Sequence, residues 1–193
     1  MDVYTSERLY LELAPVDKSL VGLTTLQQEL PLRKPAWLIR PQKLHLTVIH
    51  FGIVREVYQE LLAYNSRLTY EAYLSAVSFF VHDIRDLLPR QTTLRATGFH
   101  MFGPARTVLA LTLHPNDELT YAHSQSLERL GHLLISCGIN DVPAFIYKSH
   151  NFRYAPDLNP HITLARNVRT LKERSLPSYP ASFDFHPAAL HGL

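Results

Sequence analysis

The sequence has little cysteine, little net charge and no long apolar run. Its one cysteine, Cys137, excludes an internal disulfide and is typical of a reducing compartment such as the cytoplasm. The formal net charge is only +2 and no long basic run occurs, which argues against extended duplex nucleic acid as a partner. No apolar run approaches the roughly 20 residues that cross a membrane. Residues 1–13 lack the pattern of a signal peptide, so we expect a cytoplasmic protein outside the membrane.

What the sequence does contain is the composition of a folded domain. Apolar residues make up 46% of the 193 residues and aromatic residues 10%, as in globular proteins. This length suits one domain and can bury a substantial core. No linker divides the chain. We therefore expect a single domain over residues 1–193, acting as a monomer.

The hydrophobic pattern predicts strands mixed with helices. The expected strands cover 8–13, 44–51, 92–101, 107–113, 161–165 and 182–185, with a short extended piece at 37–40. The expected helices cover 17–30, 54–88 in two pieces broken near 65–66, and 117–137 between an Asn116 N-cap and Gly138. Residues 140–159 are expected to be irregular. This order predicts an α+β fold with a mainly antiparallel sheet and helices packed outside it.

One four-residue pattern occurs twice, once in each half of the chain. His45-Leu-Thr-Val48 and His161-Ile-Thr-Leu164 both read His-aliphatic-Thr-aliphatic, and both fall in expected strands. A bare His-x-Thr triplet should arise about once by chance in this composition, whereas the full pattern should arise roughly 0.05 times. Two copies therefore indicate a shared function.

Strand geometry puts the histidine and threonine of each pattern on one face, because residues two apart in a strand point the same way. Their aliphatic neighbours are then expected in the core: Leu44, Leu46, Val48, Ile162 and Leu164.

Two imidazoles and two hydroxyls suit phosphodiester cleavage. A neutral imidazole takes the proton of an attacking water, and a protonated one gives a proton to the departing ribose oxygen. The hydroxyls of Thr47 and Thr163 can donate to phosphate oxygens. This scheme needs no metal, and the sequence has neither a cysteine pair nor a His-Glu-x-x-His motif for zinc.

These motifs resemble those of the 2H phosphoesterase superfamily, and most of all its bacterial 2′-5′ RNA ligase and cyclic nucleotide phosphodiesterase branch. The residues that carry the resemblance are Leu44-His-Leu-Thr-Val48 with Phe51-Gly52, Pro160-His-Ile-Thr-Leu-Ala-Arg166, and the segment 98–109 between them. The resemblance implies a bilobal fold of two pseudo-symmetric antiparallel-sheet lobes around a central cleft. It also implies His45 and His161 as the catalytic pair, Thr47 and Thr163 as phosphate-binding residues, and no cofactor.

The chain departs from the family pattern in two places. The helical stretch 58–89 is longer than most members need, and it could either cap the cleft or add a packing helix. Residues 186–193 do not clearly complete the last strand of the family.

Arg166 matches the second family motif, but strand parity groups it with Ile162 and Leu164. A strand end or a β-bulge would be needed to turn it toward the site. A salt bridge and a phosphate contact therefore both stay open for its side chain.

Four further residues are candidates for substrate contacts. Phe102 and Tyr154 could stack on a base, with ordinary packing as the alternative. Lys148 and Arg153 could contact a phosphate.

The remaining histidines lack a motif. His50 lies five residues after His45, so it is expected on the opposite face of the strand. The others are expected at the surface: His100, His114, His123, His132, His150, His186 and His191.

The sequence favours a metal-independent hydrolase of a 2′,3′-cyclic, 1″,2″-cyclic or 2′-5′ phosphodiester in a nucleotide or short RNA end. Two alternatives remain open. One is a non-catalytic RNA- or nucleotide-binding module of the same fold, although a pure binder has no need of both imidazoles. The other is 2′-5′ RNA ligation, which uses the same site in reverse.

Overall fold

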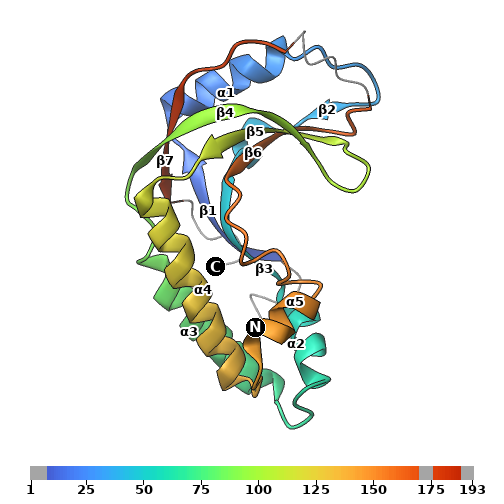
Figure 1. The fold of residues 1–193 in the computed structure, drawn as a ribbon, viewed down its shortest axis with the longest axis vertical. Coiled ribbons are helices and arrows are strands. Elements are labelled where there is room, and N and C mark those ends of the chain that lie inside the picture. Colours follow the sequence, from blue (N-terminus) through green and yellow to red (C-terminus); the bar gives the residue numbers. More distant parts are fainter. Residues whose placement is uncertain (1–7, 170–175, 188–193) are drawn as a thin grey trace.

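The computed structural model describes residues 8–169 and 176–187. Its strands are β1 (Arg8–Pro15), β2 (Trp37–Leu38), β3 (Leu46–Ile53), β4 (Thr92–Phe102), β5 (Val108–His114), β6 (His161–Arg166) and β7 (Ser182–Pro187). Its helices are α1 (Asp17–Glu29), α2 (Val54–Leu62), α3 (Tyr70–Arg85), α4 (Asp117–Ser136) and α5 (Val142–Lys148), with a 3-10 turn at Pro41–Lys43. The ribbon has a C-shaped outline, with the curved sheet at the top in Figure 1 and the long helices below it.

The strands form one continuous antiparallel sheet. Their order is β2-β6-β3-β1-β7-β4-β5, and β6 also pairs with β5. Because β6 hydrogen-bonds to both β3 and β5, six of the strands close into a ring, with β2 added beside β6. The two halves of the chain therefore share one ladder of hydrogen bonds, instead of each holding a separate sheet. The expected α+β class with an antiparallel sheet and outer helices is confirmed.

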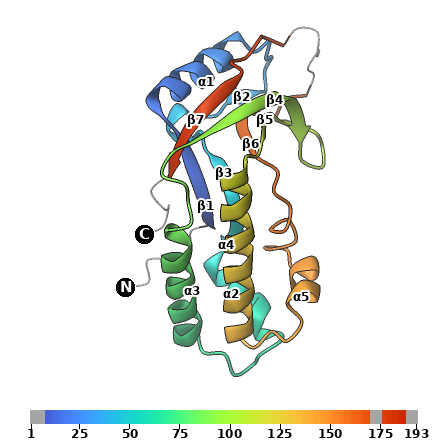
Figure 2. The same ribbon diagram turned by 60° about the vertical axis from the view of Figure 1, so that its left-hand side comes forward.

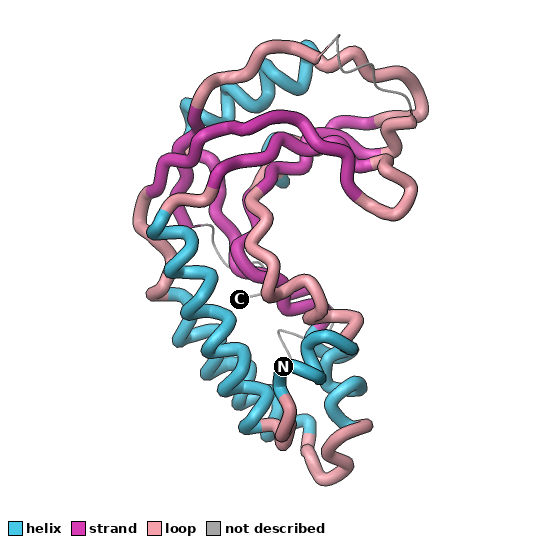
Figure 3. Tube along the Cα trace, in the orientation of Figure 1, coloured by secondary structure: helices cyan, strands magenta, loops and turns pink. Residues whose placement is uncertain are grey.

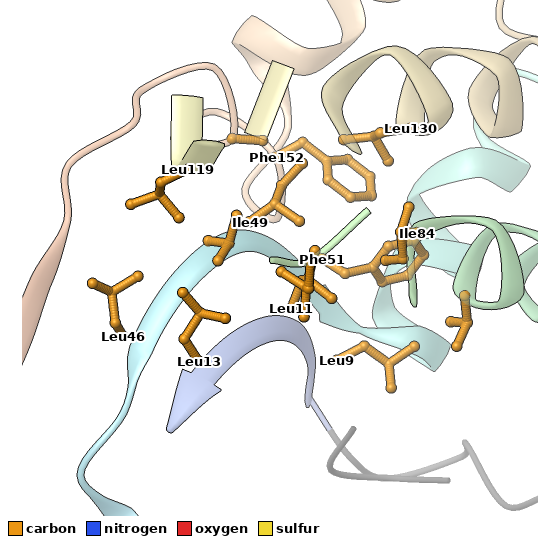
Figure 4. Packing of buried hydrophobic residues seen from close by; sticks show 14 of the residues in the cluster. Leu9, Leu11, Leu13, Leu46, Ile49, Phe51, Ile84, Leu119, Leu130 and Phe152 are labelled. Atoms are coloured by element: carbon orange, nitrogen blue, oxygen red, sulfur yellow. The ribbon is translucent and has the colours of Figure 1, made fainter. Parts of the chain in front are cut away.

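One face of this sheet is apolar and is covered by helices. Leu11 pairs with Ile49 and Leu13 with Leu46, so these four side chains share a face. Figure 4 shows them packed with residues of α3 and α4, among them Ile84, Leu119 and Leu130. The other face of the sheet is left for polar side chains.

Helix α1 covers the same apolar face further along the sheet. Phe183 lies on this face of β7, and its ring is 3.6 Å from the point where a Cβ on Gly22 of α1 would stand. The Ser19 hydroxyl of α1 accepts a hydrogen bond from the backbone N–H of Asp184.

The helical stretch 58–89 is a packing element and not a cap. Helix α3 buries Tyr73, Val77, Phe80 and Ile84, and it lies alongside α4, as Figure 2 shows. Figure 3 shows the same pair of helices on one side of the molecule, below the strands. The length of this stretch thus adds apolar core.

Most expected elements occur close to their expected bounds, including both caps of α4. The Asn116 side chain accepts a hydrogen bond from the Leu119 N–H, and Gly138 has φ +94° just beyond the helix. The expectation that residues 140–159 are irregular was wrong in part, because Val142–Lys148 form α5. Its N-cap is Asp141, whose side chain accepts from the Ala144 N–H.

The last strand reaches Pro187, and the end of the stretch 186–193 lies outside the described residues. Among the described residues, no helix is both long and apolar enough to cross a membrane.

Candidate active site

The two His-x-Thr patterns meet where β3 and β6 pair. Leu46 is the partner of Ile162 in an antiparallel register. Continued by one residue in each direction, this register puts His45 opposite Thr163 and Thr47 opposite His161. Residues directly opposite have Cβ atoms about 5 Å apart, and diagonal neighbours lie about 7–8 Å apart. Each imidazole therefore has the other motif's hydroxyl beside it, and the two imidazoles lie diagonally on one face.

The aliphatic neighbours hold this face in position. Leu44, Leu46, Val48, Ile162 and Leu164 are all buried, as the parity of the sequence predicts. Among the described residues, no partner hydrogen-bonds to the hydroxyl of Thr47 or Thr163, so both can serve a ligand.

Both imidazoles are oriented by the same kind of hydrogen bond. Nδ1 of His45 lies 3.0 Å from the carbonyl oxygen of Lys43, and Nδ1 of His161 lies 2.7 Å from that of Asn159. Because a carbonyl oxygen only accepts, Nδ1 carries a hydrogen in both rings. Nε2 is then the nitrogen that can take up or release a proton in each.

His45 also lies beside a buried carboxylate that the sequence patterns did not reveal. Glu12 of β1 is opposite Thr47 and only 4% exposed, and its Oε2 is 3.5 Å from Nδ1 of His45. Tyr10 stacks on the same imidazole, with the ring centroids 5.3 Å apart. Glu12 therefore adds an acidic group beside this imidazole.

His161 has different surroundings. Phe102 stacks on its ring with a centroid distance of 4.5 Å, and His100 packs against Phe102 at 4.7 Å. Burial lowers the pKa of His161 below its ordinary 6.5, and the nearby His45 and His100 act in the same direction, against the hydrogen bond to Asn159. His161 therefore favours the neutral form.

A β-bulge corrects the expected direction of His50. Thr47 pairs with Glu12 and Ile49 with Leu11, so Val48 is an extra residue in β3. The bulge reverses the parity, and His50 lies on the same face as His45, with its ring 5.9 Å from that of Tyr10. The expectation that it faces away was wrong.

A second bulge turns Arg166 toward the site. Along β5, the alternate residues Val108, Ala110 and Thr112 pair with Arg166, Thr163 and His161, which leaves Leu164 as the extra residue of β6. The Arg166 side chain therefore lies on the same face as the histidines and threonines of the two motifs. Strand parity alone would have put it on the opposite face, and the bulge reverses that parity.

The chain is similar to solved structures, whereas no family model and no curated protein matches it. LigT of E. coli complexed with phosphate gives a TM-score of 0.54 at 13% identity, covering 96% of each chain. LigT complexed with 3′-AMP gives 0.54 at 14% identity over the same shares. The crystal structure of a phosphoesterase gives 0.51 at 14% identity, covering 95% of this chain and 96% of the other. LigT is a 2H phosphoesterase.

The chain has the 2H phosphoesterase fold. At these identities the likeness establishes the fold and leaves the reaction to be argued from the site. It bears out the expected resemblance, and the fold contains the two paired motifs described above.

Three other candidates for substrate contacts lie in the segment before β6 of the 2H phosphoesterase fold. Tyr154 is exposed in the loop before β6, and the guanidinium of Arg153 lies over its ring at 4.6 Å. Lys148 ends α5. No ring contact or hydrogen bond between described residues joins any of the three to His45 or His161.

Two histidines without a motif have surroundings that the sequence did not indicate. His123 was expected at the surface but is buried, and its Nε2 donates to the carbonyl of Ala155 at 2.8 Å. His100 is exposed, as expected, and it lies on the site face because it pairs with Ala110, the partner of Thr163. Neither outcome has a signal in the local sequence, since both depend on neighbours from distant strands and loops.

Within the described part of the chain, no group of three or more His, Cys, Asp or Glu residues could hold a metal ion. A hollow of about 490 Å³ lies between α3 and α4, and no residue of the candidate site lines it.

Proposed function

We propose that the chain is a phosphodiesterase that hydrolyses a 2′,3′-cyclic, 1″,2″-cyclic or 2′-5′ phosphodiester of a nucleotide or RNA end. The observation that carries this is the crossed arrangement around Leu46 and Ile162. It sets two imidazoles diagonally on one face of the sheet, each with a threonine hydroxyl beside it. Such an arrangement provides a base, an acid and two donors for phosphate oxygens.

In the proposed mechanism His161 is the base and His45 the acid. Nε2 of neutral His161 removes a proton from water while the water oxygen bonds to phosphorus. The bond from phosphorus to a ribose oxygen breaks, and Nε2 of protonated His45 gives that oxygen its proton. The lowered pKa of His161 and the Glu12 carboxylate beside His45 support this assignment. The products are a phosphomonoester and a free hydroxyl.

The phosphate is held by hydroxyls and a guanidinium. Thr47 and Thr163 donate to the non-bridging oxygens, where negative charge grows as the water attacks. Arg166, on the same face, can offset the charge of the phosphate. These groups hold the phosphate and offset its charge, a role that a metal ion fills in metal-dependent phosphodiesterases.

Two other functions use the same site. Ligation of RNA through a 2′-5′ bond reverses the proposed steps and exchanges the roles of the two histidines. A binding module would keep the phosphate contacts and lose turnover. Of the three functions, the lowered pKa of His161 favours an acid–base catalyst, because a binder gains nothing from holding one imidazole neutral.

The test is turnover of 2′,3′-cyclic nucleotides, 2′-5′ oligoadenylate and ADP-ribose cyclic phosphate by the purified chain. His45→Ala and His161→Ala should each reduce kcat by roughly 10²–10⁴-fold with folding unchanged, because each removes one proton-transfer group. His114→Ala, at the exposed end of β5, is the matched control and should leave kcat as it is. Full activity in the His45→Ala, His161→Ala double variant would show that another site is responsible.

A further inference from the structure

Trp37 is the only tryptophan of the chain and lies at the edge of the candidate site. It pairs with Arg166 across the short β2–β6 ladder, so the indole and the guanidinium point to the same side of the sheet. That side also carries Thr163 and His161. The side chain of Trp37 is 54% exposed, which leaves much of a large apolar ring in contact with water.

The other two aromatic candidates for base stacking already have partners. Phe102 lies against the His161 imidazole, and Tyr154 is covered on one side by Arg153. Among the described aromatic residues, Trp37 stacks on none, and about half of its side chain is exposed to a ligand. The next residue, Leu38, pairs with Ala165 and points to the opposite side of the sheet.

The position of Trp37 suits one nucleotide. Arg166 follows Thr163 by three residues along a bulged strand, which corresponds to roughly 7–10 Å. A phosphate held between the two motifs therefore has its own ribose and base within reach of the indole.

We infer that Trp37 and Arg166 form a nucleoside subsite, in which the indole stacks on the substrate's base and the guanidinium lies beside its ribose or an adjoining phosphate. This inference rests on the proposed function and assigns the substrate to compounds that carry a nucleobase. Every base has a π-face and no donor or acceptor pattern is read here, so the subsite accepts purines and pyrimidines alike.

Because Trp37 is the sole tryptophan, its fluorescence reports on this subsite alone. The unmodified chain is titrated with 3′-AMP, with ribose 5-phosphate and with inorganic phosphate, under excitation that adenine does not absorb. The adenine compound should change the emission in a saturable way, whereas the two compounds without a base should leave it unchanged. Equal responses to 3′-AMP and ribose 5-phosphate would overturn the subsite.

Kinetics give an independent measurement. Trp37→Ala should raise KM for a nucleoside 2′,3′-cyclic phosphate about 5- to 100-fold with little change in kcat, because stacking holds the substrate before and during the reaction. Trp37→Phe should retain most of the affinity, and Leu38→Ala, next in sequence but on the other face, should change neither constant. An unchanged KM in Trp37→Ala contradicts the inference.

Calorimetric binding of 3′-AMP separates the two proposals. If 3′-AMP binds and the chain hydrolyses cyclic nucleotides while the Trp37 emission stays constant, the subsite is wrong and the proposed function stands. If 3′-AMP binds with a Trp37 response but no phosphodiester is cleaved, the subsite stands and the proposed catalysis fails. If the chain neither binds 3′-AMP nor cleaves any of the phosphodiesters, both the subsite and the proposed function are wrong.

Discussion

At the scale of single residues, the two motifs are alike in sequence and unlike in surroundings. Both imidazoles donate through Nδ1 to the carbonyl two residues earlier, so both present Nε2. A buried carboxylate, Glu12, lies beside His45, whereas Phe102 and a further imidazole flank His161. Two identical side chains therefore have surroundings that differ in charge and solvation, and burial lowers the pKa of His161.

The pH dependence of kcat/KM should follow from this difference. The base must be neutral, so activity rises with pH as His161 loses its proton, and that limb should lie below pH 6.5 because the pKa of His161 is lowered. Activity falls again at higher pH as the acid, His45, loses its proton. The measurement is the full profile on one substrate. A rising limb centred above pH 7 would contradict His161 as the base.

Replacement of Glu12 tests whether its carboxylate takes part in the reaction. Glu12→Gln removes the negative charge beside His45 while keeping the shape of the side chain, so kcat/KM should fall while the rising limb barely moves. Glu118→Gln, in the first turn of α4, makes the same chemical change away from the site and should change neither kcat/KM nor the limb. If the profile of Glu12→Gln matches that of Glu118→Gln, the carboxylate has no part in proton transfer.

At the scale of elements, the junction between β3 and the loop before β6 holds the two motifs together. Glu60 of α2 accepts hydrogen bonds from the Ser149 hydroxyl and the Asn151 amide, which ties that loop to the first half of the chain. Gly52, in β3, has φ +99°, and the Asn151 side chain occupies the space where a Cβ would stand. The absence of a side chain at Gly52 therefore allows the loop to close on β3.

Gly52→Ala should destabilise the fold by about 1–3 kcal/mol, because it forces both a left-handed backbone and a clash with Asn151. Gly22→Ala is the matched control. Gly22 lies within α1 and a Cβ there meets only ordinary contacts, so that change should be neutral or stabilising by up to about 1 kcal/mol. Free energies of unfolding from denaturant titration measure both. Equal stability of the two variants would contradict the role given to Gly52.

At the scale of the whole molecule, the strand order ties the ends of the chain together. Strand β7, near the carboxyl end, lies between β1 and β4, and β6 joins β3 to β5. No cut in the sequence separates two halves that each keep their own hydrogen-bond partners. That residues 1–193 form one domain remains a prediction, and this topology is its physical reason.

We expect thermal unfolding of the intact chain in one cooperative transition. Deletion of residues 176–193 removes β7 and exposes edges of β1 and β4, so both halves should lose their structure together. Phe183→Ala, a milder change, should cost about 3–5 kcal/mol because Phe183 is fully buried under α1. Circular dichroism and calorimetry measure both variants. Two separate transitions in the intact chain would show that the halves fold independently.

Chelators should leave the proposed activity of the whole molecule intact. The proposed reaction takes its base, its acid and its phosphate donors from His161, His45 and the threonines, so no step passes through an ion. The measurement is the initial rate after dialysis against EDTA. Loss of activity that zinc or magnesium restores would refute the metal-independent mechanism.

The sequence by itself determined what depends on short-range pattern. Alternation within a strand depends on adjacent residues alone, which is why the two motifs, their buried neighbours and their shared face could be predicted. The class of fold followed from the order of such segments, and the caps of α4 followed from Asn116 and Gly138.

Only the tertiary structure decided which side chains join the motifs. The directions of His50 and Arg166 depend on bulges at Val48 and Leu164, and a bulge is set by the hydrogen-bond register with a neighbouring strand. Glu12, His100 and Trp37 reach the site because strands distant in sequence lie side by side. The pattern along one segment carries no information about that register. The positions of these residues beside the motifs therefore follow only from the pairing of the strands.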